Sequence, residues 1–273
     1  MKTLSQKTIT YTLTTLLFCL FFYLTSNGQE AKEQKSGPSA EELAKANNPL
    51  ADLIAFNIQY YYRPQLNETT GGMANTTWFR FAVPTGRVLW RLSAPLETRH
   101  LNNETTNFSK SGFGDLDLFA AYLITSKPKL TFGVGPAASF NTASDAALGS
   151  GKNTLGVAAV AFAAPNPQFQ FGGLLTWRAD VGGDVNRESV NMLAVQPFYF
   201  WQLGKGLYFR GAPIMPFDLD KGEYHVPVGL GIGKVIKMNK TVFNFFVEPQ
   251  PSVLVHGAGQ PTFQIYTALN MQF

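Results

Sequence analysis

The feature that most limits the fold is a series of twelve short runs, from residue 51 onward, in which apolar or aromatic residues recur at every second position. A period of two indicates β-strands whose two faces meet different surroundings. The runs begin near Leu53, Trp78, Val88, Asp115, Leu130, Thr154, Phe169, Val190, Leu207, Tyr224, Val242 and Thr262. The sequence therefore predicts an all-β domain that extends from residue 51 to residue 273.

The connections between the runs alternate in length. The short connections, which follow the even-numbered runs, are 85–87, 126–129, 165–168, 203–206 and 237–240. Longer and more polar stretches, such as 63–77, 99–113, 141–152 and 251–261, follow the odd-numbered runs. Short turns at one rim and longer loops at the other are typical of outer-membrane barrels. With twelve strands, both ends of the barrel sequence are expected on the rim of short turns.

Individual runs place two kinds of residue on opposite faces. In the run at 88–96, the even positions are Val, Trp, Leu, Ala and Leu, and the odd positions are Leu, Arg, Ser and Pro. A soluble sandwich also alternates in this way, with its apolar face buried. Charged residues, however, make up only 15% of this chain, against about 25% in ordinary soluble domains. We therefore predict a transmembrane, antiparallel, up-and-down β-barrel of about 12 strands.

The first 28 residues have the layout of a secretory signal peptide, with Lys2 and Lys7 ahead of an apolar run. The alternative is an uncleaved anchor, but about 12 apolar residues fall short of the ~20 that a spanning helix needs. Cys19, the one cysteine, lies within this run, so the mature chain has neither disulfides nor a catalytic thiol. Export without a later apolar helical span leaves two classes, a soluble exported protein and a barrel in the outer membrane of a Gram-negative bacterium.

Residues 29–50 form a polar segment between the predicted signal peptide and the barrel. Ser39 and Glu42 have the spacing of a helix capping box, which predicts a short helix over 40–46. We expect this segment on the periplasmic side. It could be a tether, a plug that enters the barrel, or a mobile leader.

Charge and motifs exclude several functions. Loss of Lys2 and Lys7 with the signal peptide lowers the net charge from +4 to +2, so no nucleic-acid partner is expected. The histidines His100, His225 and His256 lack metal-ligand spacing, and we expect no metal and no cofactor. The chain has no G-x-S-x-G motif, so we expect no enzyme; a lipid-modifying barrel with a Ser–His pair is the enzymatic alternative. The glycines of 229–233 are interpreted as thinning the lumen wall or easing its curvature.

Charged residues on the strands alternate with apolar neighbours. An arginine that faces lipid near the bilayer centre costs about 2–4 kcal/mol, so these side chains are expected to point inward. There they either pair with each other or line a polar pathway, and a mixed lining disfavours strong ion selectivity. The predicted lumen-lining residues are Arg80, Arg91, Asp115, Asp117, Arg178, Arg210, His225 and Glu248.

Several segments of the chain resemble one bacterial family of outer-membrane proteins. They are 37–56, 111–119, 132–156, 190–201 and 224–237, and the most specific piece is SDAALGSGK at 144–152. The family comprises transporter-like proteins classed with the meta-cleavage pathway of phenol degradation. The resemblance implies an outer-membrane barrel that passes small hydrophobic or aromatic compounds. The segment 57–81 departs from the family pattern, since it lacks a tryptophan-rich first hairpin.

The last strand, at 261–273, is expected to pair with the first, because an open sheet edge is not stable in hydrocarbon. Leu269, Met271 and Phe273 form a lipid-facing row, which resembles the terminal signal that the barrel assembly machinery recognises. The expected partners are outer-membrane lipids, this machinery and a small hydrophobic solute. The leading hypothesis is a passive channel, and the alternative is a closed structural or partner-binding barrel.

Overall fold

The computed structural model describes residues 40–102, 107–127 and 129–273. The predicted signal peptide, Cys19 and the capping residue Ser39 lie outside this range. A short helix, α2 (Ala40–Asn47), comes first, close to the predicted bounds of 40–46. Within the described ranges, no helix is long and apolar enough to cross a membrane.

Strands account for most of the chain after α2. The uninterrupted strands are β1 (Ala55–Leu66), β2 (Met73–Thr85), β3 (Val88–Asn102), β6 (Leu130–Phe140), β7 (Lys152–Ala163), β8 (Phe169–Gly183), β9 (Asn191–Gly204), β14 (Thr241–His256) and β15 (Pro261–Gln272). The others come in consecutive pairs, namely β4 (Asn107–Phe113) with β5 (Leu116–Lys127), β10 (Leu207–Gly211) with β11 (Met215–Asp218), and β12 (Tyr224–Pro227) with β13 (Gly231–Met238).

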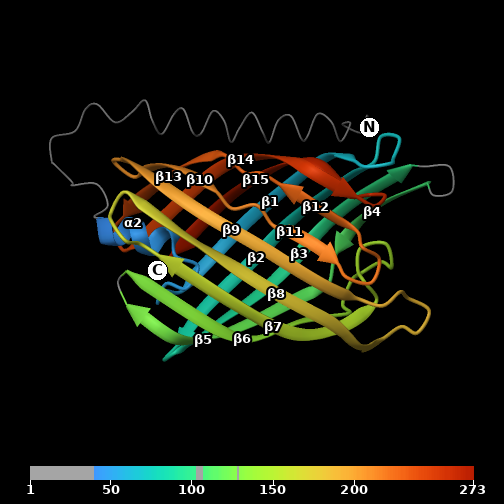
Figure 1. Cartoon of the computed structure of the whole chain (residues 1–273), viewed down its shortest axis with the longest axis horizontal. Helices are drawn as coiled ribbons and strands as arrows, with labels where there is room; N and C mark the ends of the chain where they lie inside the picture. Colours follow the sequence, from blue (N-terminus) through green and yellow to red (C-terminus); the bar gives the residue numbers. More distant parts are fainter. Residues whose placement is uncertain (1–39, 103–106, 128) are drawn as a thin grey trace, which may run out of the picture. The chain divides into compact units, whose positions relative to one another are not determined.

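Each consecutive pair is one barrel strand with a break in it. Strand β3 pairs with β4 over one half of its length and with β5 over the other, and β9 and β14 bridge the remaining two breaks in the same way. The described strands therefore make twelve antiparallel barrel strands (Figure 1). Strand β15 pairs with β1, from Ala55 opposite Gln272 to Leu66 opposite Pro261, and this seam closes the barrel.

The break between β12 and β13 lies opposite two prolines of β14. Proline has no backbone N–H, so it can accept a ladder hydrogen bond but cannot donate one. The N–H groups of Val228 and Leu230 donate to the carbonyls of Pro251 and Pro249, at 2.9 and 3.4 Å, without reciprocal bonds. The two strands therefore share fewer backbone hydrogen bonds at this point, and the strand is interrupted there.

Some strands are longer than the sequence predicts. The stretch 99–113, predicted as a loop, contains the end of β3 and all of β4, paired from Leu96 opposite Phe113 to Asn102 opposite Asn107. Strand β14 likewise runs to His256 through a predicted loop. These extensions lie beyond the apolar belt, where both faces meet water and the inside–outside alternation weakens. A prediction from hydropathy alone therefore placed the ends of these strands too early.

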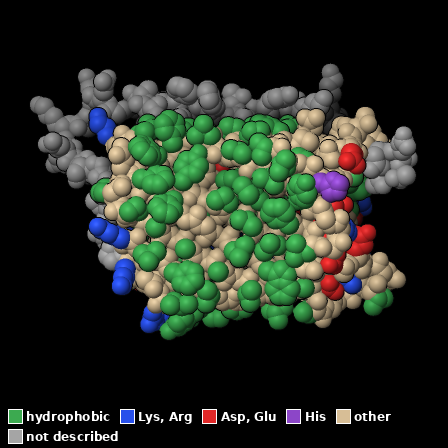
Figure 2. All heavy atoms as spheres, in the orientation of Figure 1, with side chains coloured by type: hydrophobic (Ala, Val, Ile, Leu, Met, Phe, Trp, Pro, Cys, Tyr) green, Lys and Arg blue, Asp and Glu red, His purple; other side chains and the backbone are tan. Residues whose placement is uncertain are grey.

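The alternation of faces agrees with the prediction for the membrane-spanning part. On β3, Trp90 and Leu92 point outward and are exposed, whereas Leu89 and Ser93 are buried. Figure 2 shows hydrophobic side chains gathered in a band across the visible face, with charged side chains at its two ends. A closed barrel with such a belt is a membrane-spanning barrel, because lipid is the solvent that an apolar exterior matches.

The two rims carry opposite charges. Five lysines lie at or beside the short turns, namely Lys127, Lys129, Lys205, Lys237 and Lys240, whereas seven acids lie at or beside the loops of the other rim, namely Glu68, Asp145, Asp184, Glu188, Asp218, Asp220 and Glu223. Basic residues form the left end of the barrel in Figure 2 and acidic residues the right end. Helix α2 lies at the end with the short turns (Figure 1).

Candidate functional site in the barrel lumen

The described residues that precede β1 pack into the short-turn end of the barrel. We call residues 43–53 the plug segment. Leu43 and Ala46 are buried in an apolar cluster with inward-facing side chains, among them Phe198, Phe200 and Tyr208 of β9 and β10. Further along, Leu50 is buried in a second cluster with residues of β2, β3, β5, β6 and β7. The lumen is therefore apolar at the end with the short turns, and the plug segment packs against this lining.

Asparagines fix the plug segment to several walls of the barrel. The Asn47 amide donates to Gln170 Oε1 of β8, at 3.3 Å, and Asn48 Nδ2 lies 3.4 Å from Thr131 Oγ1 of β6. From β14, Asn244 Nδ2 donates to the Ala46 carbonyl (3.1 Å) and to Asn47 Oδ1 (3.2 Å). These bonds tie residues 46–48 to three separated strands, β6, β8 and β14, whereas residues 29–39 of the predicted N-terminal segment lie outside the described range.

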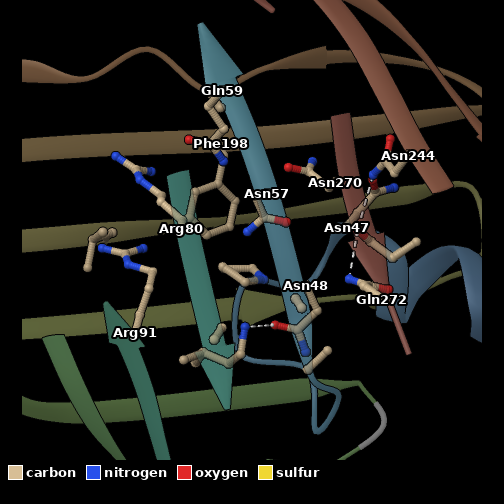
Figure 3. Close-up of a pocket in the computed structure, with 18 of the residues that line it drawn as sticks. Asn47, Asn48, Asn57, Gln59, Arg80, Arg91, Phe198, Asn244, Asn270 and Gln272 are labelled. Carbon is tan, nitrogen blue, oxygen red and sulfur yellow. Dashed lines mark hydrogen bonds between the residues drawn. The ribbon is translucent and has the colours of Figure 1, made fainter. Parts of the chain in front are cut away.

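A cavity of about 160 Å³ lies beside the plug segment (Figure 3). Its lining is part amide, part cationic and part apolar. In Figure 3, Arg80 and Arg91 project from one side, and Asn244, Asn270 and Gln272 lie on the other. The lining also includes Asn57, Gln59, Phe119, Val160, Leu174, Phe198 and the predicted lumen residue Arg210.

Arg80 and Arg91 lie close together on β2 and β3. Arg80 is paired with Ser93 and Arg91 with Ala82, so the two arginines are diagonal neighbours on the inner face. Each guanidinium carbon lies 5.0 Å from a ring centroid, that of Trp78 for Arg80 and that of Phe119 for Arg91. Among the described residues, neither arginine has a carboxylate partner, and the buried Nε of each has no hydrogen-bond acceptor.

The other predicted strand arginines are paired. Arg178 of β8 forms an ion pair with Asp117 of β5 across the lumen. Arg210 Nε donates to Glu248 Oε2 at 2.7 Å, in a pair that is almost completely buried. Its guanidinium carbon also lies 3.3 Å from the centre of the Phe246 ring. These pairs stabilise the lumen wall.

A ladder of side chains extends from Glu248 along the wall. Glu248 Oε1 accepts from Gln250, Gln250 accepts from Gln264, and Gln264 accepts from Arg63, at 2.6, 2.6 and 3.0 Å. The ladder crosses β14, β15 and β1, so it reinforces the closing seam from inside. Arg63 was not predicted as a lumen residue, because it begins the stretch 63–77 that the sequence predicts to be a loop.

Asp115 does not line the cavity. Its carboxylate accepts from the backbone N–H groups of Thr142, Ala143 and Ser150, at 3.1, 3.1 and 2.7 Å, and from the Ser150 hydroxyl at 2.9 Å. It therefore orders the loop between β6 and β7, which contains the SDAALGSGK stretch. The alternation that suggested a lumen position holds up to Asp117, but Asp115 lies in the break between β4 and β5.

The predicted histidine and the terminal residues are placed as follows. His225 is buried on β12 and hydrogen-bonds through Nδ1 to Gln260 Oε1 at 3.0 Å, away from the cavity. On β15, Leu269 and Met271 face outward, and the following Phe273 is 57% exposed. The N–H of Phe273 donates to the Ile54 carbonyl at 2.9 Å, next to the β1–β15 seam.

Amide residues are the part of the site that sequence reasoning missed. Asn57, Gln59 and Gln272 line the cavity, and the buried Gln59 Oε1 and Asn270 Oδ1 have no hydrogen-bond partner among the described residues. A signal for them was present, because each occupies an inward position of an alternating strand. Only charged residues were assigned to the lumen from sequence, although an amide that faces hydrocarbon without a hydrogen-bond partner also costs free energy.

In the part of the chain that the structure describes, no group of three or more His, Cys, Asp or Glu side chains is placed to hold a metal ion. The glycines of the 229–233 stretch make room for large inward side chains. A Cβ at Gly229 would lie 2.0 Å from Glu248 Oε1, and one at Gly233 would lie 2.3 Å from the Tyr208 ring. A side chain at either position would therefore displace a buried neighbour on the inner face of the wall.

Comparisons with known proteins identify the fold. No protein-family model matches the chain, and no curated protein matches it. Among solved structures, an outer membrane channel from Pseudomonas putida F1 is similar with a TM-score of 0.61 and 11% identity, over 89% of this chain and 100% of that chain. The NanC porin is similar with a TM-score of 0.48 and 9% identity, over 81% of this chain and 98% of that chain. The KdgM porin, solved with disordered oligogalacturonate, has a TM-score of 0.44 and 9% identity, over 80% of this chain and 98% of that chain. The first likeness shows that this chain has the fold of outer-membrane barrels.

Proposed function

We propose that the protein is an outer-membrane channel through which small solutes pass passively. The observation that carries this proposal is the cavity inside the lumen, lined by Arg80, Arg91 and several amides. A barrel of purely structural role has no need to keep polar groups around an internal space, since buried polar groups without partners are costly. The similar solved structure from Pseudomonas putida F1, which its description calls a channel, supports the same function.

The size of the cavity limits the solute. A cavity of about 150 Å³ holds one benzene molecule in an engineered protein, and the cavity here is about 160 Å³. The plug segment occupies the lumen beside it. We therefore expect solutes of about one aromatic ring, unless the plug segment moves during passage.

The family resemblance gives the proposal a finer form. We propose kinship with the transporter-like proteins classed with the meta-cleavage pathway of phenol degradation, whose expected solutes are small aromatic compounds. The SDAALGSGK stretch, which carries the resemblance most specifically, forms the loop that Asp115 orders. We further propose that outer-membrane lipids cover the apolar belt and that a cleaved signal peptide directs export.

Planar-bilayer recordings and liposome uptake with purified protein test the channel. We expect small, steady conductance and faster uptake of single-ring solutes than of larger ones. A variant with Asn47→Ala and Asn244→Ala, which loses hydrogen bonds between the plug segment and the wall, is expected to conduct more. Absence of both conductance and flux, in the wild type and in this variant, would contradict the proposal.

The alternative is a closed barrel of structural or partner-binding role. The observation that favours it is the number of walls to which the plug segment bonds. The same recordings decide between the two functions, because a closed barrel conducts in neither form. We propose no enzymatic activity, since among the described residues His225 bonds to Gln260 and the ring of His256 packs 5.8 Å from that of Tyr224, without a serine partner.

A further inference from the structure

Arg80 and Arg91 differ from every other arginine of the described lumen. Arg178 has Asp117, Arg210 has Glu248, and Arg63 donates to Gln264 and Thr76. Arg80 and Arg91 each contact an aromatic ring, and the charge of Asp117, which also acts on Arg91, is ion-paired with Arg178. We propose that these two arginines form a binding site for the carboxylate of a small organic anion. The anion would be the solute class of the proposed channel. Its passage through the barrel depends on the proposed channel function, but its binding to the two arginines does not.

The geometry favours an anion with two or more oxygens. Diagonal neighbours across paired strands are about 7–8 Å apart at the backbone, so the two like charges converge on one part of the cavity. The buried Nε of each arginine has no acceptor within the described structure. Guanidinium groups present N–H donors in a planar fork that matches a carboxylate. A bound carboxylate would satisfy these donors and relieve the repulsion between the two cations.

The rest of the cavity favours an apolar body on this anion. Phe119 and Leu174 line the same space as the two arginines, together with Val160 and Phe198. A fully hydrated inorganic ion would leave this surface in contact with water, whereas an aromatic ring would cover it. The amide oxygens of Gln59 and Asn270, which are buried and unpartnered, could in addition accept from a hydroxyl on the ring. The site thus fits a small aromatic carboxylate better than a neutral hydrocarbon.

Three single-ring probes of similar size test whether binding depends on the charge of the ligand. Benzoate, benzamide and benzylammonium carry charges of −1, 0 and +1 on one ring. Titration calorimetry with full-length protein in detergent is expected to give the tightest binding for benzoate. Each lost arginine contact should weaken benzoate binding about tenfold, because a hydrogen bond to a charged group changes affinity by about that factor.

Matched variants keep the test specific. R80Q/R91Q should lose most of the preference for benzoate over benzamide, and R80K/R91K should keep part of it. The control, K127Q/K240Q, removes the same two charges from exposed sites on the rim of short turns and should bind as the wild type does. A difference in gel migration between heated and unheated samples verifies that each variant is a folded barrel.

The outcomes for site and channel are distinguishable. Benzoate binding that is tighter than benzamide binding and is lost in R80Q/R91Q supports the site, even where recordings show no conductance and the channel proposal fails. Equal binding of benzoate and benzamide, or unchanged benzoate binding in R80Q/R91Q, overturns the site, even where the protein conducts. In a conducting protein, the reversal potential in a KCl gradient should indicate anion preference in the wild type and move toward cations in R80Q/R91Q.

Discussion

Replacing Glu248 by glutamine tests whether the lumen wall beside β14 is dry. The Glu248 side chain is 0% exposed, and its two oxygens accept from Arg210 Nε, from the N–H of Ala212 and from the Gln250 amide, at 2.7, 2.7 and 2.6 Å. Glutamine of the same length offers one oxygen and one NH₂ group. At least one of the three donors would then face another donor.

The loss of stability expected for Glu248→Gln follows from the burial of the Arg210–Glu248 pair. The Arg210 side chain is 6% exposed and would lose its only carboxylate partner among the described residues. Removal of one member of a buried ion pair costs about 3–5 kcal/mol, whereas an exposed pair contributes about 0–1 kcal/mol. With a urea dependence of about 3 kcal/mol per molar, the unfolding midpoint should fall by more than about 1 M.

Urea unfolding in detergent or phospholipid micelles, followed by tryptophan fluorescence, measures this shift. The double variant R210M/E248M should be more stable than E248M alone, because no buried charge is left unpaired. As a control, Glu188→Gln breaks an ion pair with Lys221 on an exposed loop and should leave the midpoint unchanged. If the free energy of unfolding of E248Q falls by less than about 1 kcal/mol, water screens the Arg210–Glu248 pair. The assignment of a dry wall would then be wrong.

Three further predictions concern the wall, a loop and the terminus. Gly229→Ala should destabilise the barrel and lower its urea midpoint, because the new Cβ would lie 2.0 Å from Glu248 Oε1. The pKa of Asp145 is lowered by hydrogen bonds from Lys110 Nζ (2.6 Å) and from a backbone N–H. A lowered folded pKa means stability that is present above the unfolded pKa and lost as pH falls through the folded one. Hydrogen exchange in the 141–151 loop, taken relative to the intrinsic rate at each pH, should therefore accelerate below about pH 4. Deletion of Phe273 should reduce insertion into the outer membrane, measured as the fraction of heat-modifiable protein.

Each of these predictions has a control. Gly173→Ala is the matched substitution, since its nearest neighbour is a backbone oxygen at 3.5 Å, and an equal loss at Gly173 and Gly229 would contradict the steric argument. Asp145→Asn should remove the acceleration in acid, and an unchanged pH profile would assign the effect to another group. Phe273→Tyr keeps an aromatic ring and should assemble as the wild type does, whereas normal assembly of the deletion would count against the terminal signal.

The barrel could be predicted from sequence because each strand meets lipid on one face and the lumen on the other, and residue types alternate accordingly. Lipid outside and a lined lumen inside give Trp90 and Ser93 opposite environments, and the period of two records this directly. The pairing of the last strand with the first was also predicted, since an unpaired edge in hydrocarbon is too costly to leave open. The strand ends could not be placed, because beyond the lipid both faces meet water and the alternation disappears.

The site was predicted only in part, for physical reasons. Sequence alternation indicates which side chains point inward, but it does not indicate which of them meet across the lumen. Arg178 and Arg80 look alike in sequence, and the strand register places Asp117 in the same row as Ser93 and Arg80, yet Asp117 forms its ion pair with Arg178. The plug segment was one of several alternatives because its contacts join residues far apart in the chain, such as Asn47 and Gln170, and no local pattern predicts such contacts.

The connection between the plug segment and β1 has a consequence for the order of folding. Gln272, on the last strand, lies within 3.4 Å of the Lys45 and Ala46 carbonyls while it pairs with Ala55 on the first strand. The contacts that hold the plug segment and those that join the two ends of the sheet therefore share one residue. Pairing of segments this far apart in sequence must overcome the entropy of loop closure and forms late. We therefore expect this end of the plug segment to dock in the same late step that closes the ring.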